Sequence, residues 1–449
     1  MNSEFNNVSF NIQGICDWKL KIHKTVYPPR EDTYLLAKAI LKLNKYDGLA
    51  LEIGCGSGAL SMLLAKRGWK VKSCDVNPYA VATSRGNIKK YNLEDKIIVD
   101  ESGIGEGVII SDKLDLIVWN LPYLNPIKGD ENMLEQIEDA AYLDIENGGW
   151  SEKLIQVLET HKISNECTVI LLFRTLPESN SNPDSWKKRG WSGRKIEEQI
   201  IGDEKLEVHA FWRPGSNNKP IFIDECKSTM DEAKENNKNH WTRIITNKQT
   251  NGRGRKGSHW RTEEGDMIGT WNISKSILNN INPGIFQITV GASIADFLKI
   301  GLKWPNDLMS NDFRKMGGIV IESDSEGEYL RVGVGINKNS KFIDDKYNAS
   351  GWNETLGELT NIEIFDMVDI ALSSNFEEHK LLPINNLSHM MDESWKSLTK
   401  TLSRGINIIN KDDEKCRVVG LSDDGELEVI GENFISTIDS LEDIRWEYT

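Results

Sequence analysis

A glycine-rich turn, EIGCGSG at residues 52–58, stands between an apolar segment and a helical pattern. Glycine lets a chain turn sharply and approach a ligand closely. The spacing is GxGxG, whereas dinucleotide-binding turns have GxGxxG, so a nicotinamide cofactor fits this turn less well. Asp75 ends the next expected strand, where its carboxylate can accept both hydroxyls of a ribose. These features favour S-adenosylmethionine as the cofactor of this region.

A second polar site, NLPY at residues 120–123, begins where another expected strand ends. Open parallel sheets bind ligands beyond the carboxyl ends of their strands. The side-chain oxygen of Asn120 and a backbone carbonyl can accept the hydrogens of a planar NH2 group, on which Tyr123 can stack. Methyl transfer from a sulfonium depends on proximity and line of attack, which such a pocket provides. Taken alone, the tetrapeptide fits an ordinary strand-to-loop turn equally well.

A basic loop, GRGRKG at residues 252–257, lacks the Gly-Lys-Ser/Thr ending of a P-loop. Its arginines can bind a phosphate through paired hydrogen bonds, although an exposed basic loop explains it equally well alone. Other motifs flank this loop on both sides in the sequence. They are Ser228-Thr229, KWPND (303–307), RKMGGI (314–319) and GVGIN (333–337).

The elements that must position these residues form three predicted units, which suits a length of 449 residues. Strands expected at 49–54, 69–76, 114–120 and 167–173, with a helix at 59–67, predict a parallel sheet covered by helices on both faces. Mixed strands and helices follow up to about residue 400. Residues 401–449 have the short strands and turns of a small β-barrel.

Residues 214–220, PGSNNKP, are a run of turn formers with no aliphatic side chain. We therefore expect a first domain at 1–213, a linker at 214–220, a second domain at 221–400 and a third at 401–449. Because no motif crosses the linker, a cut between Ser216 and Asn217 is expected to give two independently folding pieces.

The charge balance, 54 Lys and Arg against 69 Asp and Glu, gives a net charge of -15 and argues against DNA binding. The N-terminal residues have no signal-peptide pattern, and apolar runs such as 168–173 are too short to cross a membrane. Six scattered cysteines without a CxxC pair predict reduced thiols in a cytosolic protein, with neither a disulfide framework nor a zinc site.

Four motifs of the first domain together resemble HemK-type glutamine methyltransferases, in the branch that modifies the GGQ loop of translation release factors. They are VYPPREDTYLL (26–36), LEIGCGSGAL (51–60), CDVNPYA (74–80) and DLIVWNLPYL (115–124). The resemblance implies a Rossmann-like methyltransferase domain. The residues it assigns to the cofactor site are Glu31, Thr33, Glu52, Gly54, Gly56, Asp75 and Asn120. It assigns Asn120, Pro122 and Tyr123 to the substrate amide, and it implies a release factor and a small zinc-binding activator subunit as partners.

Leu121 departs from the Asn-Pro-Pro-Tyr pattern of that family. Its carbonyl can still accept a hydrogen bond, but the rigidity of proline is lost. The tetrapeptide with leucine is similar to that of ribosomal-RNA adenine dimethylases, so an RNA substrate stays open. The acidic balance and the EDT motif at 31–33 favour protein glutamine.

The motifs after the linker resemble biotin protein ligases of the BirA type, across roughly residues 220–449. This implies an α+β catalytic domain and a C-terminal SH3-like barrel. The reaction joins biotin to AMP, because a free carboxylate is a poor acyl donor, and a lysine amine of a biotin carboxyl carrier protein of an acyl-CoA carboxylase then attacks. The resemblance assigns Ser228, Thr229 and Gln249 to the biotin head group, Trp260 to the pocket wall and Gly265 to a close approach to biotin.

The same resemblance implies that Arg253 and Arg255 hold the adenylate phosphate and that Lys315 bridges phosphate and biotin carboxylate. Asp307 would order ATP and magnesium. The remaining substrate-binding residues implied by these motifs are Gly254, Asn306, Gly318 and Asn337. Met230 and Ser258 depart from the family, which has Asn and Arg there, and the winged-helix DNA-binding domain of repressor-type ligases is absent.

We therefore expect a bifunctional cytoplasmic enzyme, a glutamine methyltransferase fused to a biotin protein ligase, with neither DNA nor membrane as a partner. Its small molecules are S-adenosylmethionine, biotin, and ATP with magnesium. The alternatives are an RNA adenine methyltransferase in the first half, or a non-catalytic sensor of biotin or S-adenosylmethionine that scaffolds a carboxylase. Retention of Asn120, Arg253, Arg255 and Lys315 speaks against a sensor, since binding alone does not require the amide pocket.

Overall fold

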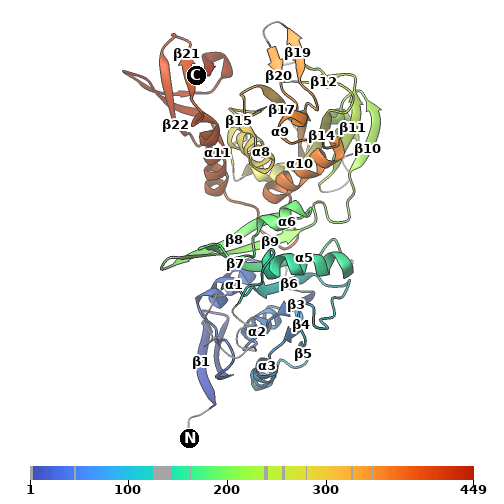
Figure 1. Ribbon diagram of the computed structural model, residues 1–449, viewed down its shortest axis with the longest axis vertical. Helices are drawn as coiled ribbons and strands as arrows, with labels where there is room; N and C mark the ends of the chain where they lie inside the picture. The colour runs from blue at the N-terminus through green and yellow to red at the C-terminus, as the bar shows by residue number, and fades with distance from the viewer. Residues whose placement is uncertain are drawn as a thin grey trace. The chain divides into compact units, whose positions relative to one another are not determined.

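The computed structural model (Figure 1) divides into two compact units. It describes residues 4–44, 47–124, 143–161, 163–236, 241–254, 258–279, 281–324, 327–344 and 347–448. Unit 1 contains residues Met1–Ser216 and His379–Pro383, and unit 2 contains Asn217–Glu378 and Ile384–Thr449. The unit boundary at Ser216 falls inside the expected linker, whereas the assignment of residues 379–383 to unit 1 differs from the expected domain ranges.

Unit 1 is built on a seven-stranded sheet of order β5-β4-β3-β6-β7-β9-β8. The first five strands in this order pair in parallel, and the last two pair antiparallel. The strands are β3 (Leu49–Ile53), β4 (Lys70–Asp75), β5 (Ile97–Glu101), β6 (Leu116–Asn120), β7 (Thr168–Leu176), β8 (Ser192–Ile201) and β9 (Glu204–Trp212). The helices are α1 (Glu31–Leu41), α2 (Ala59–Lys66), α3 (Pro78–Lys90), α5 (Gly149–His161) and α6 (Asp184–Lys188).

Both faces of this sheet are buried, as the continuous apolar strands predict. Along β6, Leu116 and Val118 belong to one core with α1, α2 and α3, whereas Ile117 and Trp119 belong to another core with α5. Figure 1 shows α5 on one side of the sheet and α2 and α3 on the other. The predicted parallel sheet with helices on both faces is confirmed.

An N-terminal hairpin, β1 (Phe5–Ile12) and β2 (Cys16–His23), packs beside α3. Lys21 donates its backbone N–H to Asn87 Oδ1 over 2.9 Å. At the start of α3, Asn77 Oδ1 accepts the N–H of Tyr79 over 2.9 Å and Pro78 occupies the first turn, so the helix begins directly after β4.

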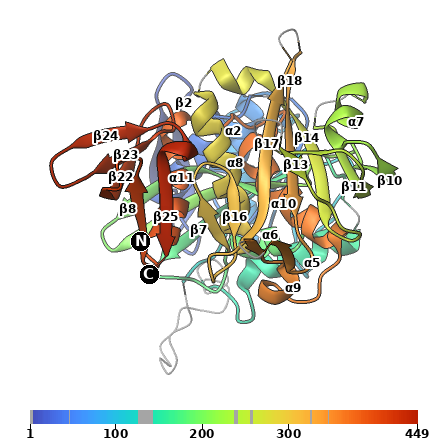
Figure 2. The ribbon, with the colours of Figure 1, turned by 90° about the horizontal axis from the view of Figure 1, so that it is seen from above.

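Unit 2 has a mixed seven-stranded sheet of order β10-β11-β14-β18-β17-β16-β15, whose central strands lie side by side in Figure 2. Only β10 and β11 pair in parallel among the described strands of this sheet. The strands are β10 (Ile221–Cys226), β11 (Arg243–Gln249), β14 (Met267–Ser274), β15 (Gly301–Lys303), β16 (Asp307–Met309), β17 (Lys315–Ser323) and β18 (Tyr329–Ile336). Two small ribbons are β12 (Gly252–Arg253) with β13 (His259–Trp260), and β19 (Lys341–Asp344) with β20 (Tyr347–Ala349).

The helices of unit 2 complete its core. They are α7 (Thr229–Glu235), η2 (Lys275–Asn279), α8 (Pro283–Leu298), α9 (Trp352–Thr355), α10 (Asn361–Phe376) and α11 (Leu387–Leu402). Helix α8 is apolar on all sides because α10 and α11 pack on it and it also contacts the sheet. A reciprocal cap starts α10, where Thr360 Oγ1 accepts the N–H of Glu363 and Glu363 Oε2 accepts the N–H of Thr360.

The C-terminal strands form an open five-stranded sheet of order β24-β23-β22-β21-β25. They are β21 (Ile406–Asn410), β22 (Lys415–Leu421), β23 (Leu427–Ile430), β24 (Ile435–Ile438) and β25 (Ile444–Tyr448), with η3 (Leu441–Asp443) before the last strand. The pairing of the described strands does not join β24 to β25, so the expected SH3-like barrel is not confirmed. Ile408, Leu427 and Val429 share the core of unit 2, so burial against the rest of that unit covers the inner face.

Within the described ranges, every helix falls short of the length and apolarity that a bilayer span requires. The same ranges contain no cluster of three or more His, Cys, Asp or Glu side chains that could hold a metal ion.

Candidate active sites

The glycine-rich turn of unit 1 connects β3 to α2 and forms part of a cavity of about 450 Å³. Gly58 has a φ of +80°, and a Cβ atom there would lie 2.5 Å from Ser84 Oγ. A side chain is therefore excluded both by the backbone conformation and by the approach of α3. The turn places the backbone of Gly54 and Gly56 at the cavity wall, where a ligand can approach it closely.

Asp75 lies at the end of β4 and faces the same cavity. Its Oδ2 accepts the N–H of Gly56 and its Oδ1 accepts the N–H of Asn77, each over 2.9 Å. Burial raises the pKa of Asp75, whereas these backbone hydrogen bonds act in the opposite direction. Because each carboxylate oxygen can accept a second hydrogen bond, this carboxylate fits the two hydroxyls of a ribose.

Glu52 lines the cavity, but its carboxyl group is hydrogen-bonded to a neighbouring side chain. Ser61 donates a hydrogen bond to Glu52 Oε2, and Ser61 Oγ lies 2.6 Å from Ser73 Oγ. Burial raises the pKa of Glu52 to about 8. The carboxyl group thus belongs to a buried polar chain between β3, α2 and β4 and carries a proton for much of the neutral range.

Asn120, at the end of β6, is held in one orientation by α1. Its Nδ2 donates to Asp32 Oδ2 over 2.9 Å, while its Oδ1 is buried without a partner among the described residues. Asp32 is fixed by Tyr27, whose hydroxyl donates to Oδ2 over 3.1 Å, and by the N–H of Thr33, which donates to Oδ1 over 2.7 Å. A buried acceptor without a donor is costly, so Oδ1 fits a ligand that brings an N–H group.

Asp32 is a residue that the sequence analysis missed. It is 3% exposed, whereas its neighbour Glu31 is exposed and does not line the cavity. The signal was present in the spacing, because residue 32 lies on the same helical face as Leu35, Leu36 and Ala39, all buried. An aspartate on an otherwise apolar helical face requires a polar partner, and here that partner is Asn120.

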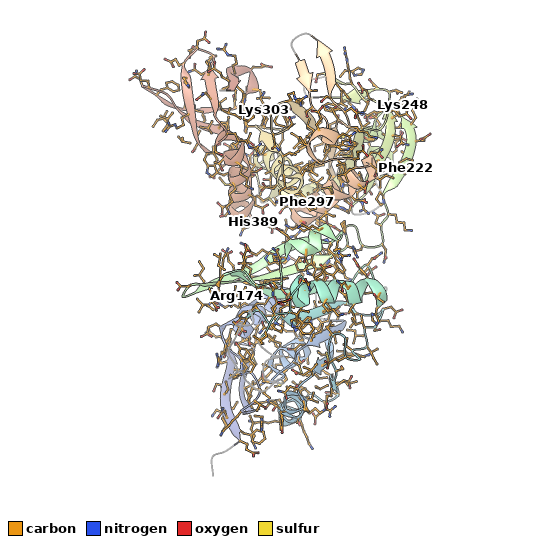
Figure 3. All side chains as sticks on the ribbon, viewed as in Figure 1. Arg174, Phe222, Lys248, Phe297, Lys303 and His389 are labelled. Carbon is orange, nitrogen blue, oxygen red and sulfur yellow. The ribbon has the colours of Figure 1, made fainter. Side chains whose placement is uncertain are left out.

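Tyr123 lies beside a buried arginine. The guanidinium carbon of Arg174 is 5.6 Å from the centre of the Tyr123 ring, and its Nη1 is 3.1 Å from Glu204 Oε1. Arg174 extends from β7 (Figure 3), and Glu204 belongs to the cavity wall. Burial raises the pKa of Tyr123, so its hydroxyl is neutral and its ring presents an apolar face to the cavity.

The structure brings most of the first group of expected site residues to this one cavity. Those that line it are Thr33, Glu52, Gly54, Gly56, Asp75, Asn120, Pro122 and Tyr123.

Unit 2 contains a second cavity, of about 350 Å³, between its sheet and the loop that follows β11. The expected residues that line it are Ser228, Thr229, Gln249, Arg253, Gly254, Trp260, Asn306, Asp307, Lys315 and Gly318. Arg255 lies outside the described residues. Gly265 and Asn337 are not part of the lining.

The indole of Trp260 forms the apolar wall of this cavity. A Cβ atom on Gly335 would lie 2.7 Å from Trp260 Cε2, so the ring packs directly on the backbone of β18. Trp260 Nε1 is buried and has no acceptor among the described residues. A flat apolar wall with one available N–H donor fits a small bicyclic ligand that carries an acceptor.

The polar end of the cavity begins where α7 starts. Ser228 Oγ accepts the N–H of Met230 over 3.3 Å and caps the helix. Gln249 Oε1 accepts the N–H of Thr229 over 2.9 Å, and Thr270 donates its hydroxyl to Thr229 Oγ1 over 2.8 Å. These contacts join α7, β11 and β14 around one group of hydrogen-bonding side chains.

Both described cations of the site are paired with carboxylates. Lys315 Nζ lies 2.7 Å from Asp307 Oδ1. Arg253 pairs with Asp231 and lies 3.3 Å from Glu322 Oε1. The side chains of Lys315 and Arg253 are each 36% exposed, so both pairs remain open to solvent and to an incoming anion.

Gly265 and Asn337 contact residues outside the cavity lining. Asn337 Nδ2 donates to the carbonyl of Ser350 over 3.1 Å. Gly265 has a φ of +91°, and Lys338, whose N–H donates to Asp266 Oδ1 over 2.9 Å, lies against it. Both residues therefore contribute to the backbone conformation at the end of the sheet where β14 begins and β18 ends.

The C-terminal sheet also contributes to the second cavity, through three residues that belong to no expected motif. Ser440, Leu441 and Glu442 line the second cavity together with the motif residues. The sheet is anchored to the rest of unit 2, because Trp304 donates its Nε1–H to the carbonyl of Gly425 over 2.9 Å. No spacing in the sequence marks these three residues.

One family model matches each half of the chain. The family model described as methyltransferase small domain matches residues 31–172, and the biotin/lipoate A/B protein ligase family model matches residues 222–339. The chain is therefore a fusion of a methyltransferase part and a biotin/lipoate protein ligase part, which confirms the two resemblances.

Named relatives divide in the same way. A putative protein N5-glutamine methyltransferase of Methanocaldococcus jannaschii is 42% identical over 123 residues, 27% of this chain and 57% of that protein. A release factor glutamine methyltransferase of Lactococcus lactis is 36% identical over 115 residues, 24% of this chain and 40% of the relative. A bifunctional ligase/repressor BirA of Bacillus spizizenii is 31% identical over 138 residues, 28% of this chain and 42% of the relative. The chain spans less than two thirds of the length of each of these relatives.

Proposed function

We propose that the chain is a bifunctional enzyme. One half transfers methyl to the side-chain nitrogen of a glutamine in a translation release factor, and the other attaches biotin to a lysine of a biotin carboxyl carrier protein through biotinyl-AMP. The observation that carries the proposal is that each unit has its own cavity, lined by the motif residues of one reaction. The names of the relatives support glutamine as the acceptor, and the name of the matching ligase family model supports biotin as the group that is attached.

In the methyltransferase cavity, catalysis is mainly orientation. S-adenosylmethionine supplies an electrophilic methyl group when it is bound beside Asp75 and the glycine turn. Asn120 Oδ1 and the carbonyl of Leu121 accept the two amide hydrogens of glutamine, and Tyr123 stacks on the amide plane. The nitrogen lone pair would then be directed at the methyl group; on transfer the sulfonium C–S bond would break, and the nitrogen would lose one of its two hydrogens as a proton. Asp32 keeps Asn120 from rotating its NH2 group toward the substrate.

In the ligase cavity, catalysis is mainly electrostatic. The biotin carboxylate attacks the α-phosphorus of ATP, pyrophosphate leaves, and the carrier lysine then attacks the acyl carbon and releases AMP. Lys315 and Arg253 stabilise the negative charge on the carboxylate and phosphate oxygens in both steps. Their carboxylate partners hold them beside the cavity before the anions arrive.

Asp307 is the residue we assign to magnesium when ATP is bound. It lies at the start of β16 and faces the cavity beside Lys315. Carboxylate oxygens are suitable magnesium ligands, and the metal usually completes its shell with phosphate and water. We also include a small zinc-binding activator subunit and a cytoplasmic location in the proposal, both by analogy with HemK-type relatives.

The test is to incubate the full-length chain with labelled S-adenosylmethionine, biotin and ATP in a cell lysate, and to identify the modified proteins by mass spectrometry. Methyl label on the GGQ glutamine of a release factor and biotin on a carrier lysine are the expected results. Label on ribosomal RNA without label on glutamine would assign the first half to RNA adenine, which the NLPY tetrapeptide keeps open. Absence of both modifications, with both ligands bound, would indicate a sensor.

A further inference from the structure

Unit 1 contains a five-residue segment that comes from far along the chain. The chain leaves unit 2 after Glu378, contributes His379–Pro383 to unit 1, and belongs to unit 2 again from Ile384. We call His379–Pro383 the strap. Leu381 and Leu382 are 0% and 1% exposed, and both belong to the apolar core that includes strands β3, β6 and β7.

The first strap residue is a buried histidine with both ring nitrogens engaged. Leu381 donates its N–H to His379 Nδ1 over 3.2 Å, so the other nitrogen, Nε2, carries the hydrogen and donates to Thr168 Oγ1 over 3.3 Å. The ring also packs against Trp212, with 5.1 Å between ring centres. Thr168 begins β7 and Trp212 ends β9, so the histidine ties two strands of the sheet together.

The strap backbone is bound at both ends of its apolar pair. Asn44 donates its N–H to the carbonyl of Leu381 over 2.8 Å, and Arg194 donates to the carbonyl of Pro383. Lys380 points outward and lies 3.2 Å from Glu166 Oε2. Hydrogen bonds, an ion pair and apolar burial thus combine on five consecutive residues. This combination is typical of a segment that belongs to the folded core rather than of a surface loop.

We propose that the strap is an integral part of the methyltransferase fold, so that residues 1–216 are incomplete without a segment encoded within the ligase half. This proposal goes beyond the two activities and supplies a physical reason for their fusion. Loss of the strap would expose the apolar surface under Leu381 and Leu382 and would remove the partner of Thr168. All of β6 pairs with the first part of β7, which begins at Thr168. Loss of the strap is therefore expected to disturb β6, the strand that ends at Asn120.

The experiment uses the full-length chain with a protease site inserted between Ser216 and Asn217. After cleavage, the two pieces are expected to co-elute in size-exclusion chromatography, because the strap remains bound to residues 1–216. In Leu381→Asp the pieces are expected to separate, since a buried unpaired carboxylate is strongly unfavourable. The matched control is Ile362→Asp on α10, where the side chain is 51% exposed, and its pieces are expected to stay together.

A second readout separates the strap from general unfolding. Before cleavage, Leu381→Asp is expected to weaken binding of S-adenosylmethionine by about tenfold or more, measured by calorimetry. Pyrophosphate release with biotin and ATP should stay within about twofold of the unmodified chain, because independent sites respond independently. If Leu381→Asp does not express, His379→Ala is the second variant, and its cleaved pieces should separate faster on dilution. Separation of the unmodified pieces, or continued association in Leu381→Asp, would overturn the proposal.

Discussion

The cavity of unit 1 and the cavity of unit 2 hold their reactive side chains in different ways. In unit 1, Asn120 is fixed by a buried hydrogen bond to Asp32, and the Asp75 carboxylate by backbone amides. In unit 2, Lys315 and Arg253 are partly exposed and paired with carboxylates. The first arrangement fixes direction, whereas the second places charge beside an anion site.

This difference follows the chemistry of the two proposed reactions. Transfer of a methyl group to an amide nitrogen depends on alignment, so the groups around the acceptor must not rotate. Activation of a carboxylate by a nucleotide gathers negative charge, so cations must be held beside the oxygens on which that charge develops. Substitutions should therefore affect the two sites through different measured quantities.

The largest effect is expected from Lys315→Ala. Removal of this cation should slow formation of biotinyl-AMP by about 10²–10³-fold, the usual loss when one group that stabilises developing charge is removed. Pyrophosphate release with biotin and ATP measures the rate. Methyl transfer by the same preparation serves as the control for folding, and a near-normal adenylation rate would reject the role of Lys315.

Asn120→Ala is expected to reduce methylation of a GGQ peptide by about 100-fold, because the acceptor amide loses its alignment. Binding of S-adenosylmethionine, measured by calorimetry, should be unchanged, since the cofactor site is formed mainly by Asp75 and the glycine turn. An equal loss of cofactor affinity and methylation would place Asn120 in the cofactor site instead.

A smaller effect is expected from Asp32→Asn. The new amide can donate to Asn120 Oδ1, so Asn120 no longer has to present its oxygen to the substrate. The loss of one hydrogen bond to a charged partner, about 1.5 kcal/mol, corresponds to about tenfold slower methylation. Tyr27→Phe is the matched control, since it removes another side-chain donor to Asp32 but not the bond to Asn120. Equal effects of both variants on methylation would contradict an orienting role for Asp32.

The last prediction concerns stability rather than rate, and its variable is pH. Since burial raises the pKa of Glu52 to about 8, the folded state binds a proton that the unfolded state releases above about pH 4.5. The free energy of unfolding of unit 1 should therefore fall as pH rises from about 4.5 to 8, and Glu52→Gln should remove this contribution. The measurement is thermal unfolding of both proteins at about pH 6 and about pH 8. The stability of Glu52→Gln relative to the unmodified chain is expected to be higher at about pH 8 than at about pH 6. A constant difference between the two proteins would mean that Glu52 is ionised throughout.

Much of the fold and of both sites could be predicted from the sequence. The strand–helix alternation placed the parallel sheet within a few residues of β3, β4 and β6, because buried parallel strands are uniformly apolar. Motif spacing also identified Asn120 and Lys315, which line the two cavities. These features are local, since a turn, a strand end or a helix start brings neighbouring residues together.

The residues that sequence reasoning missed depend on contacts between distant segments. Asp32 matters only because α1 lies beside the end of β6, 88 residues further along the chain. Ser440–Glu442 reach the second cavity through the docking of the C-terminal sheet in unit 2. That sheet was expected to close into a barrel, which is not confirmed, because the pairing of its described strands does not join β24 to β25.

By itself, the sequence predicted two reaction chemistries, their order along the chain and several of the motif residues that line each cavity. Only the tertiary structure decided which segments of the chain make up unit 1, since it adds His379–Pro383 to Met1–Ser216. Thr168 and His379 are separated by 211 residues, and no spacing or periodicity relates them. Their hydrogen bond, and the burial of Leu381 and Leu382 beside it, exist because apolar side chains are buried wherever the folded chain leaves a matching surface.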